Sequence, residues 1–148
     1  MDSVFHNKVL MVTVTSWLIA QAIKVTLGVF RERRFNFKWL IGTGGMPSSH
    51  AAGATALATA CGLHAGFSSV PFALATVFAL VTMFDAQGVR RSAGQQAAIL
   101  NQIMDDMYWS GKLESEKLME LIGHSPLQVL VGGLLGVVLS ATFYNIWY

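Results

Sequence analysis

Long apolar runs constrain the fold of this chain more than any other feature. The first run, Val9 to Phe30, has 22 residues, and only Gln21 and Lys24 are strongly polar within it. Because a helix rises about 1.5 Å per residue, such a run can cross a bilayer core of about 30 Å. Only 12% of the 148 residues are charged, roughly half the fraction typical of a soluble domain. The sequence therefore predicts an all-α integral membrane protein whose first span is permanent.

Three further apolar runs follow: Ser48 to Gly66, Val70 to Phe84 and Pro126 to Tyr148. The second run is rich in Ala and Gly, and the last has Gly132 and Gly136 four residues apart, a pattern that lets helices pack closely in lipid. The third run is short for a span, and we expect it to continue as helix through Asn101 and to emerge from the membrane. We predict one domain, residues 1–148, with about four transmembrane helices.

The segment from Asp105 to Gly123 is the only mostly polar stretch. Its apolar residues are spaced as one stripe along a helix: Leu113, Leu118, Leu121 and Ile122. This pattern predicts a cytoplasmic surface helix that ends at Gly123. Ser125 is expected to cap the last helix and Pro126 to be its first residue.

The distribution of charge predicts how the chain is oriented. With alternating spans, most of the basic residues share one side: Arg31, Arg33, Arg34, Lys38, Arg90, Arg91, Lys112 and Lys117. The positive-inside rule places that side in the cytoplasm and both termini on the opposite side. The net charge of +2 is too small to indicate a nucleic-acid partner, and the single cysteine, Cys61, cannot form an intrachain disulfide.

The stretch from Gly44 to His50 has the features of a phosphate site. Its glycines allow a tight turn with close approach to a ligand, and Pro47 suits the first turn of a helix. The next residues then lie where free N–H groups and the positive end of the helix dipole point outward. The structural alternative is a tight loop capped by a serine.

Other polar residues could belong to the same site. Lys24 and Arg31 are seven residues apart and project from nearly one helix face, although a lysine near a span end often only snorkels to the headgroups. Arg34 and its basic neighbours are expected to touch anionic lipid. His50 and His124 both adjoin helix starts on the predicted cytoplasmic face, where a capping role is the alternative.

Several of these residues stand in a recognisable order: Lys24 and Arg31, Pro47-Ser48-Ser49-His50, Arg90, and His124 with Gln128. This order resembles the three-part signature of the type 2 phosphatidic acid phosphatase superfamily, which also contains vanadium haloperoxidases. The strings Gly44 to His50, Asp85 to Arg90 and Gly123 to Val129 look like its small divergent branch. The resemblance covers nearly the whole chain from Lys24 onward, with fewer spans than the six usual in its lipid phosphatases.

The resemblance implies a role for each matching position. His124 would be the nucleophile that takes the phosphoryl group, and His50 would protonate the departing oxygen. The phosphoryl oxygens would be held by the basic residues and by the cradle of the first loop: Lys24, Arg31, Arg90, Gly45, Ser48 and Ser49. These roles need no metal or other cofactor, because fixed cations and N–H donors can stabilise the charge of a transferring phosphoryl group.

The sequence departs from the family pattern at three places. Glu32 replaces a proline, so Arg34 becomes an alternative to Arg31 as a phosphate ligand. The last motif normally has only a few residues between its arginine and its histidine, but here 33 residues separate Arg90 from His124. Gln128 replaces the aspartate that orients the nucleophile. Its carbonyl can accept the imidazole N–H but offers no negative charge, and Asp85 is the candidate for the missing carboxylate.

We expect a metal-independent phosphatase that acts on a phosphate monoester or pyrophosphate, and the membrane setting favours a lipid substrate. Its partners would be the lipid substrate, the membrane lipids and a second copy that completes the Ala/Gly-rich packing. One alternative is a vanadate-dependent peroxidase, and another is a non-catalytic module that binds lipid phosphate or assists membrane assembly. A Mg²⁺ site of the phosphatidyl transferase type, formed by Asp85, Asp105 and Asp106, fits no known spacing.

Overall fold

The structure, a computed structural model, describes residues 4–33, 45–109 and 124–146. Within these ranges every regular element is a helix: η1 (Val4–His6), α1 (Lys8–Glu32), α3 (Ser49–Ala65), α4 (Val70–Gln87), α5 (Val89–Trp109) and α6 (Pro126–Ile146). The all-α prediction is therefore confirmed, and the helix ends lie close to the ends of the predicted apolar runs. Ser125 caps α6 as expected, because its Oγ accepts a hydrogen bond from the Gln128 N–H at 3.3 Å.

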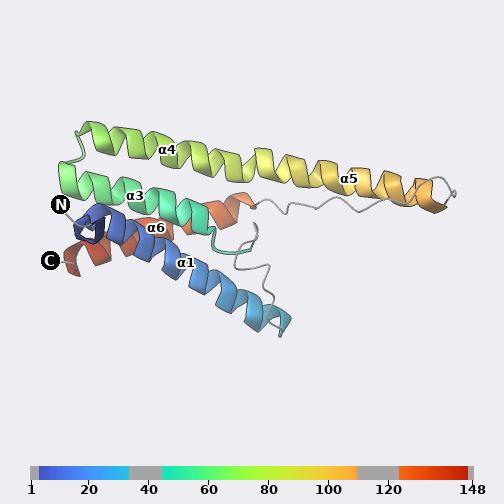
Figure 1. Cartoon of the computed structure of the whole chain (residues 1–148), viewed down its shortest axis with the longest axis horizontal. Coiled ribbons are helices and arrows are strands. Elements are labelled where there is room, and N and C mark those ends of the chain that lie inside the picture. The colour runs from blue at the N-terminus through green and yellow to red at the C-terminus, as the bar shows by residue number, and fades with distance from the viewer. Residues whose placement is uncertain (1–3, 34–44, 110–123, 147–148) are drawn as a thin grey trace.

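Helices α1, α3, α4 and α6 form a bundle with α3 at its centre (Figure 1). Both termini of the chain lie at one end of this bundle. Helix α5 continues the direction of α4 and extends beyond the other end, with Gly88 between the two helices. Helix α5 passes Asn101, the residue to which the third apolar run is predicted to continue as helix, and runs on to Trp109.

Small residues explain why α3 takes the central position. Its buried side chains are almost all alanines: Ala51, Ala52, Ala54, Ala56, Ala58 and Ala60. Two hydroxyl groups bond across to backbone carbonyls of the neighbouring helix, from Thr55 to Gly133 at 2.8 Å and from Ser140 to Ala56 at 2.9 Å. Close helix approach thus brings hydrogen bonding as well as van der Waals packing, which suits an apolar solvent.

Three helical stretches are long and apolar enough to cross a membrane: Lys8–Glu32, Val70–Asp105 and Pro126–Ile146. The second of the four predicted apolar runs forms α3, which packs in the same bundle and has 17 residues. At about 1.5 Å per residue α3 is roughly 26 Å long, a little less than a bilayer core. The outward faces carry large apolar side chains, such as Leu74, Phe78 and Leu134, as a lipid-facing surface requires.

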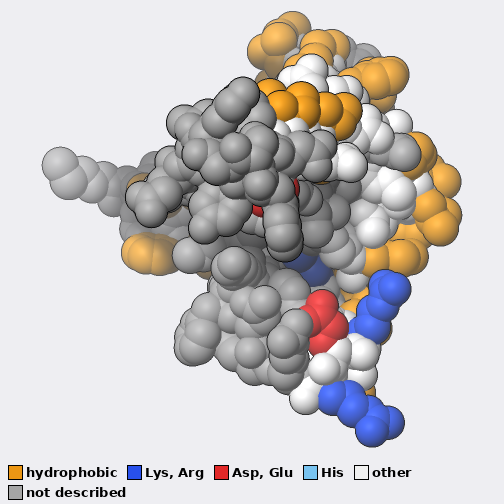
Figure 2. Space-filling view, turned by 90° about the vertical axis from the view of Figure 1, so that its right-hand side faces the viewer, with side chains coloured by type: hydrophobic (Ala, Val, Ile, Leu, Met, Phe, Trp, Pro, Cys, Tyr) orange, Lys and Arg blue, Asp and Glu red, His pale blue; other side chains and the backbone are white. Residues whose placement is uncertain are grey.

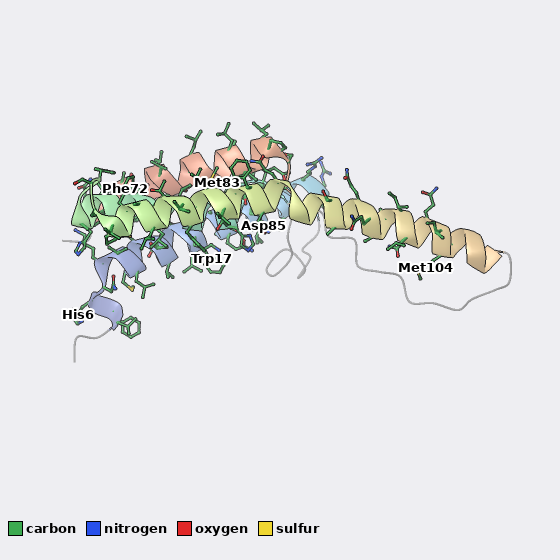
Figure 3. All side chains as sticks on the ribbon, turned by 90° about the horizontal axis from the view of Figure 1, so that it is seen from above. His6, Trp17, Phe72, Met83, Asp85 and Met104 are labelled. Carbon is green, nitrogen blue, oxygen red and sulfur yellow. The ribbon has the colours of Figure 1, made fainter. Side chains whose placement is uncertain are left out.

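The predicted surface helix lies mostly outside the described residues. Its expected first residue, Asp105, instead belongs to the last turns of α5, which is one unbroken helix up to Trp109. Figure 3 shows Met104 on this outer part of α5, far from the packed helices. The remainder, residues 110–123, is among the residues that the structure does not describe.

Candidate functional site

Four helices contribute residues to one end of the bundle, opposite the chain termini (Figure 1). Helices α3 and α6 begin there, α4 ends there, and α1 passes with Lys24 facing inward. Asp85 marks the place where α4 reaches this end (Figure 3). The fold therefore brings together sequence segments that are far apart along the chain.

The first piece is the loop that leads into α3. Gly45 has a φ of 85°, a left-handed conformation that glycine adopts readily. Ser48 is fully buried, its Oγ accepts from the Ala51 N–H at 3.4 Å, and its own N–H donates to the Gln128 carbonyl at 3.1 Å. The backbone N–H of Ser48 therefore anchors the loop to α6. Ser49, also buried, opens the first turn of α3, where helix geometry leaves N–H groups for a ligand.

The second piece is the start of α6, which forms a reciprocal capping box. Ser125 Oγ accepts from the Gln128 N–H at 3.3 Å, and Gln128 Oε1 accepts from the Ser125 N–H at 3.0 Å. The same Oε1 lies 3.3 Å from His124 Nδ1. Because a backbone N–H identifies this atom of Gln128 as the oxygen, His124 must carry its proton on Nδ1. In the neutral ring the lone pair is then on Nε2.

His124 is almost completely buried, with 1% of its surface exposed, and both its ring and its backbone have hydrogen-bond partners. Its backbone N–H donates to the Ala86 carbonyl near the end of α4 at 3.2 Å. Nε2 is buried, and none of the residues that the structure describes gives it a hydrogen bond. A buried nitrogen without a partner is unfavourable for folding, so it points to a ligand.

The surroundings of His124 favour the neutral ring. Burial lowers the pKa of the imidazole, and the nearby Lys24 and His50 lower it further by charge repulsion. The hydrogen bond with Gln128 and the Gly45 backbone act in the opposite direction, but the net pKa remains below its ordinary value. An unprotonated Nε2 is therefore available at neutral pH.

Lys24 reaches the same place from α1. It continues the buried stripe of that helix, in which Val12, Ser16 and Ala20 precede it at intervals of four residues. Only 5% of its surface is exposed, so it lies inside the bundle and does not snorkel outward. The Gly45 backbone passes against its side chain, because a Cβ on Gly45 would lie 3.4 Å from Lys24 Cε.

The other predicted site residues divide into three groups. His50 lies in the first turn of α3 and is exposed, and Asp85 is half-buried next to Ala86. Arg31 is exposed near the end of α1, where the helix extends beyond the bundle (Figure 1). Figure 2 looks onto this end and shows basic side chains projecting outward at its lower edge. Arg34 and the side chain of Arg90 lie outside what the structure describes.

Two contributors were missed by sequence reasoning. The Ala86 carbonyl holds the backbone of His124, and Gly132 lies directly against the backbone of Ser48. The Ala86 contact involves only backbone and has no signature in the sequence. The Ser-x-x-Gln pattern of Ser125 and Gln128 is a capping-box signal that could have predicted how the glutamine side chain is held. Among the described residues no group of three or more His, Cys, Asp or Glu is arranged to hold a metal.

Comparison with known proteins agrees with the resemblance. Residues 5–139 match the family described as the Divergent PAP2 family. The chain is 39% identical over 145 residues to the uncharacterized membrane protein YuiD of Bacillus subtilis (strain 168), an alignment that covers 90% of this chain and 92% of that protein. No solved structure matches. The match along almost the whole chain shows that this integral membrane protein belongs to the Divergent PAP2 family.

Proposed function

We propose that this protein hydrolyses a phosphate monoester or pyrophosphate of a lipid, with His124 as the nucleophile. The observation that carries the proposal is the His124 ring. Gln128 fixes its proton on Nδ1, and the buried Nε2 has no hydrogen-bond partner among the described residues, while Lys24 and His50 lie near the ring. Membership in the Divergent PAP2 family supports a phosphatase relationship.

The reaction takes two steps. The Nε2 lone pair attacks phosphorus, the bond from phosphorus to the lipid oxygen breaks, and a protonated His50 gives its proton to the departing oxygen. Water then attacks the phosphohistidine, His50 takes a proton from it, and the N–P bond breaks to release phosphate and a neutral His124. Gln128 keeps the Nδ1 proton in place during both steps.

The charge on the phosphoryl group is balanced by cations and N–H donors. Lys24 lies within the site, and the first turn of α3 offers the N–H of Ser49 and the positive end of the helix dipole. Arg90 lies in the first turn of α5, close to the end of α4, and we assign it to the phosphoryl oxygens together with Arg31 or Arg34. Such an arrangement works without a metal ion, since fixed cations stabilise the transition state.

The test is phosphate release by the detergent-purified full chain from phosphatidate, phosphatidylglycerophosphate and prenyl pyrophosphates, with EDTA present. Turnover that persists in EDTA and is lost in a His124→Asn variant supports a metal-independent histidine mechanism and identifies the substrate class. Turnover that EDTA abolishes, or that His124→Asn retains, contradicts it. A His64→Asn variant is the matched control, because His64 lies at the opposite end of α3.

One observation favours a second candidate, a non-catalytic module that binds lipid phosphate. Gln128 occupies the position of the orienting carboxylate and brings no negative charge to stabilise an imidazolium. Binding of a lipid phosphate without turnover of any substrate in the panel would identify this function.

We also propose that the site faces the cytoplasm, with both termini opposite, as the distribution of basic residues predicts. Cysteine accessibility in sealed vesicles tests this orientation. A second copy of the chain is our proposed partner, and crosslinking that finds only monomers in native membranes would contradict it.

A further inference from the structure

Gly132 on α6 touches the backbone of the site loop. It lies one helical turn after Gln128, and a Cβ placed on it would be 3.0 Å from Ser48 N, 3.1 Å from Ser48 C and closer still to the Ser48 carbonyl oxygen. These neighbours are backbone atoms of a fully buried residue, so they cannot turn aside as a flexible side chain does. Only glycine allows α3 to begin so close to α6.

The contact is connected to the nucleophile through a single residue. The Gln128 carbonyl accepts the Ser48 N–H at 3.1 Å, and the Gln128 side chain lies 3.3 Å from His124 Nδ1. The backbone of Ser48 is therefore held by Gln128 on one turn of α6 and by Gly132 on the next. Ser49 and His50 follow Ser48 directly, so the same two contacts also place them relative to His124.

We propose that Gly132 is a positioning residue that sets the distance between the start of α3 and His124. This inference rests on the proposed function, because its consequence is a catalytic geometry. A methyl group at this position would push Ser48 away from α6 and carry Ser49 and His50 with it. Since a misplacement of about 1 Å can reduce a reaction rate about a hundredfold, the change would lower kcat strongly.

The same helix provides two matched glycine controls. A Cβ on Gly133 would meet Met83 Cε and Thr55 Cγ2 at 3.5 Å, which is ordinary van der Waals distance. A Cβ on Gly136 would collide with the Ala52 carbonyl and the Thr55 hydroxyl, one turn farther from the site. A Gly→Ala change has the same intrinsic effect on helix formation at all three positions. The variants therefore differ only in what the added methyl meets.

The experiment measures kcat, KM and thermal midpoint for the three alanine variants of the full chain in detergent, with phosphatidate as substrate. We expect Gly132→Ala to lower kcat about 10- to 100-fold with a smaller change in KM. Gly136→Ala should lower the thermal midpoint but change kcat less than about threefold, and Gly133→Ala should change neither. An unchanged kcat in Gly132→Ala, or an equal loss of kcat in Gly136→Ala, would overturn the proposal.

A second pair of variants covers the case in which Gly132→Ala does not fold. Ser48→Ala and Ser48→Gly both lack the hydroxyl, but only glycine frees the backbone that Gly132 holds. We expect a lower kcat in Ser48→Gly than in Ser48→Ala. Equal values would contradict a positioning role for this contact.

The affinity for inorganic orthovanadate separates this proposal from the proposed function. Vanadate takes the five-coordinate geometry of a transferring phosphoryl group, so it reports on the site without turnover. If the wild-type chain binds vanadate but hydrolyses no substrate, the phosphatase proposal fails. The positioning role of Gly132 is then still supported if Gly132→Ala weakens vanadate binding at least about tenfold and Gly133→Ala does not. It is overturned if both variants bind vanadate as the wild type does.

Discussion

Each end of the helix bundle carries a lysine and a histidine, but the two ends differ in how far these side chains are exposed. At the end with the chain termini, Lys8 Nζ lies 3.9 Å above the ring of Tyr144, whose hydroxyl is 3.1 Å from His64 Nδ1. His64 is exposed and Lys8 only half-buried. At the other end, Lys24 and His124 are 5% and 1% exposed.

The two ends differ in whether their polar groups have partners within the bundle. The lysine, tyrosine and histidine at the termini satisfy one another, and together they join α1, α3 and α6. At the opposite end, Lys24 and His124 are both buried, and Nε2 of His124 has no hydrogen-bond partner in the described part of the chain. Such burial does not help folding, so a ligand is the better explanation for it.

The largest expected effect separates the two histidines. His124→Ala should reduce phosphate release at least about a thousandfold, because it removes the nucleophile. His64→Ala should leave kcat within about twofold of the wild type. Initial rates with the substrate identified in the panel check both values. Equal losses in the two variants would remove the functional distinction between the ends.

Lys24 and Lys8 should differ as the two histidines do, with the larger effect on activity at Lys24. Lys24→Met should lower kcat/KM about a hundredfold by removing a cation from the phosphoryl group. Lys8→Met should leave kcat/KM unchanged and remove a cation–π contact worth about 0.5–1 kcal/mol. Kinetics and thermal unfolding of both variants in one detergent make the comparison. A stable Lys24→Met with full activity would exclude Lys24 from the site.

The pH profile sharpens the account of His124. Its pKa is lowered, so the ring stays unprotonated below the usual histidine value of about 6.5, and kcat/KM should decline only at more acid pH. Gln128→Glu keeps the capping box and adds a negative charge beside Nδ1. That charge favours the imidazolium, raises the pKa, and should move the acid limb upward by about one pH unit or more. An acid limb at the same pH in both proteins would show that His124 does not control it.

The smallest expected effect belongs to the terminal end. Tyr144→Phe removes the hydroxyl that meets His64 but keeps the ring beneath Lys8. Loss of one partly exposed hydrogen bond should lower the free energy of unfolding by about 0.5–1.5 kcal/mol. Denaturation in detergent measures this loss, and phosphate release should be unaffected. A fall in activity would mean that the two ends are coupled through the helices.

The sequence predicted the helices and the gathering of motifs because both leave clear patterns. Apolar length marks α1, α4 and α6, and Ser125 before Pro126 predicts where α6 begins. The resemblance to a superfamily predicts that His50 and His124 share a site, and family membership is shown.

The sequence could not predict where packing ends. Lys24 and Arg31 share a helix face, but α1 extends beyond the helices that pack against it. Lys24 is therefore buried and Arg31 is exposed. The contact between the Ala86 carbonyl and the His124 N–H has no side-chain signature. The spacing of Gly132 and Gly136 predicts close packing but does not identify Ser48 as the neighbour. The central position of α3 also depends on how α1, α4 and α6 pack around it, which the sequence of α3 alone does not specify.

The most direct measurement is the capture of the phosphorylated enzyme. A His50→Ala variant is mixed with an aryl phosphate that is radiolabelled on phosphorus and whose leaving group needs no proton. The reaction is quenched in alkali within milliseconds. The account predicts label on Nε2 of His124, in an N–P bond that is stable in alkali and labile in acid, and no label in a His50→Ala, His124→Ala double variant. Rapid release of the aryl group without label on His124, or label on another residue, would contradict it.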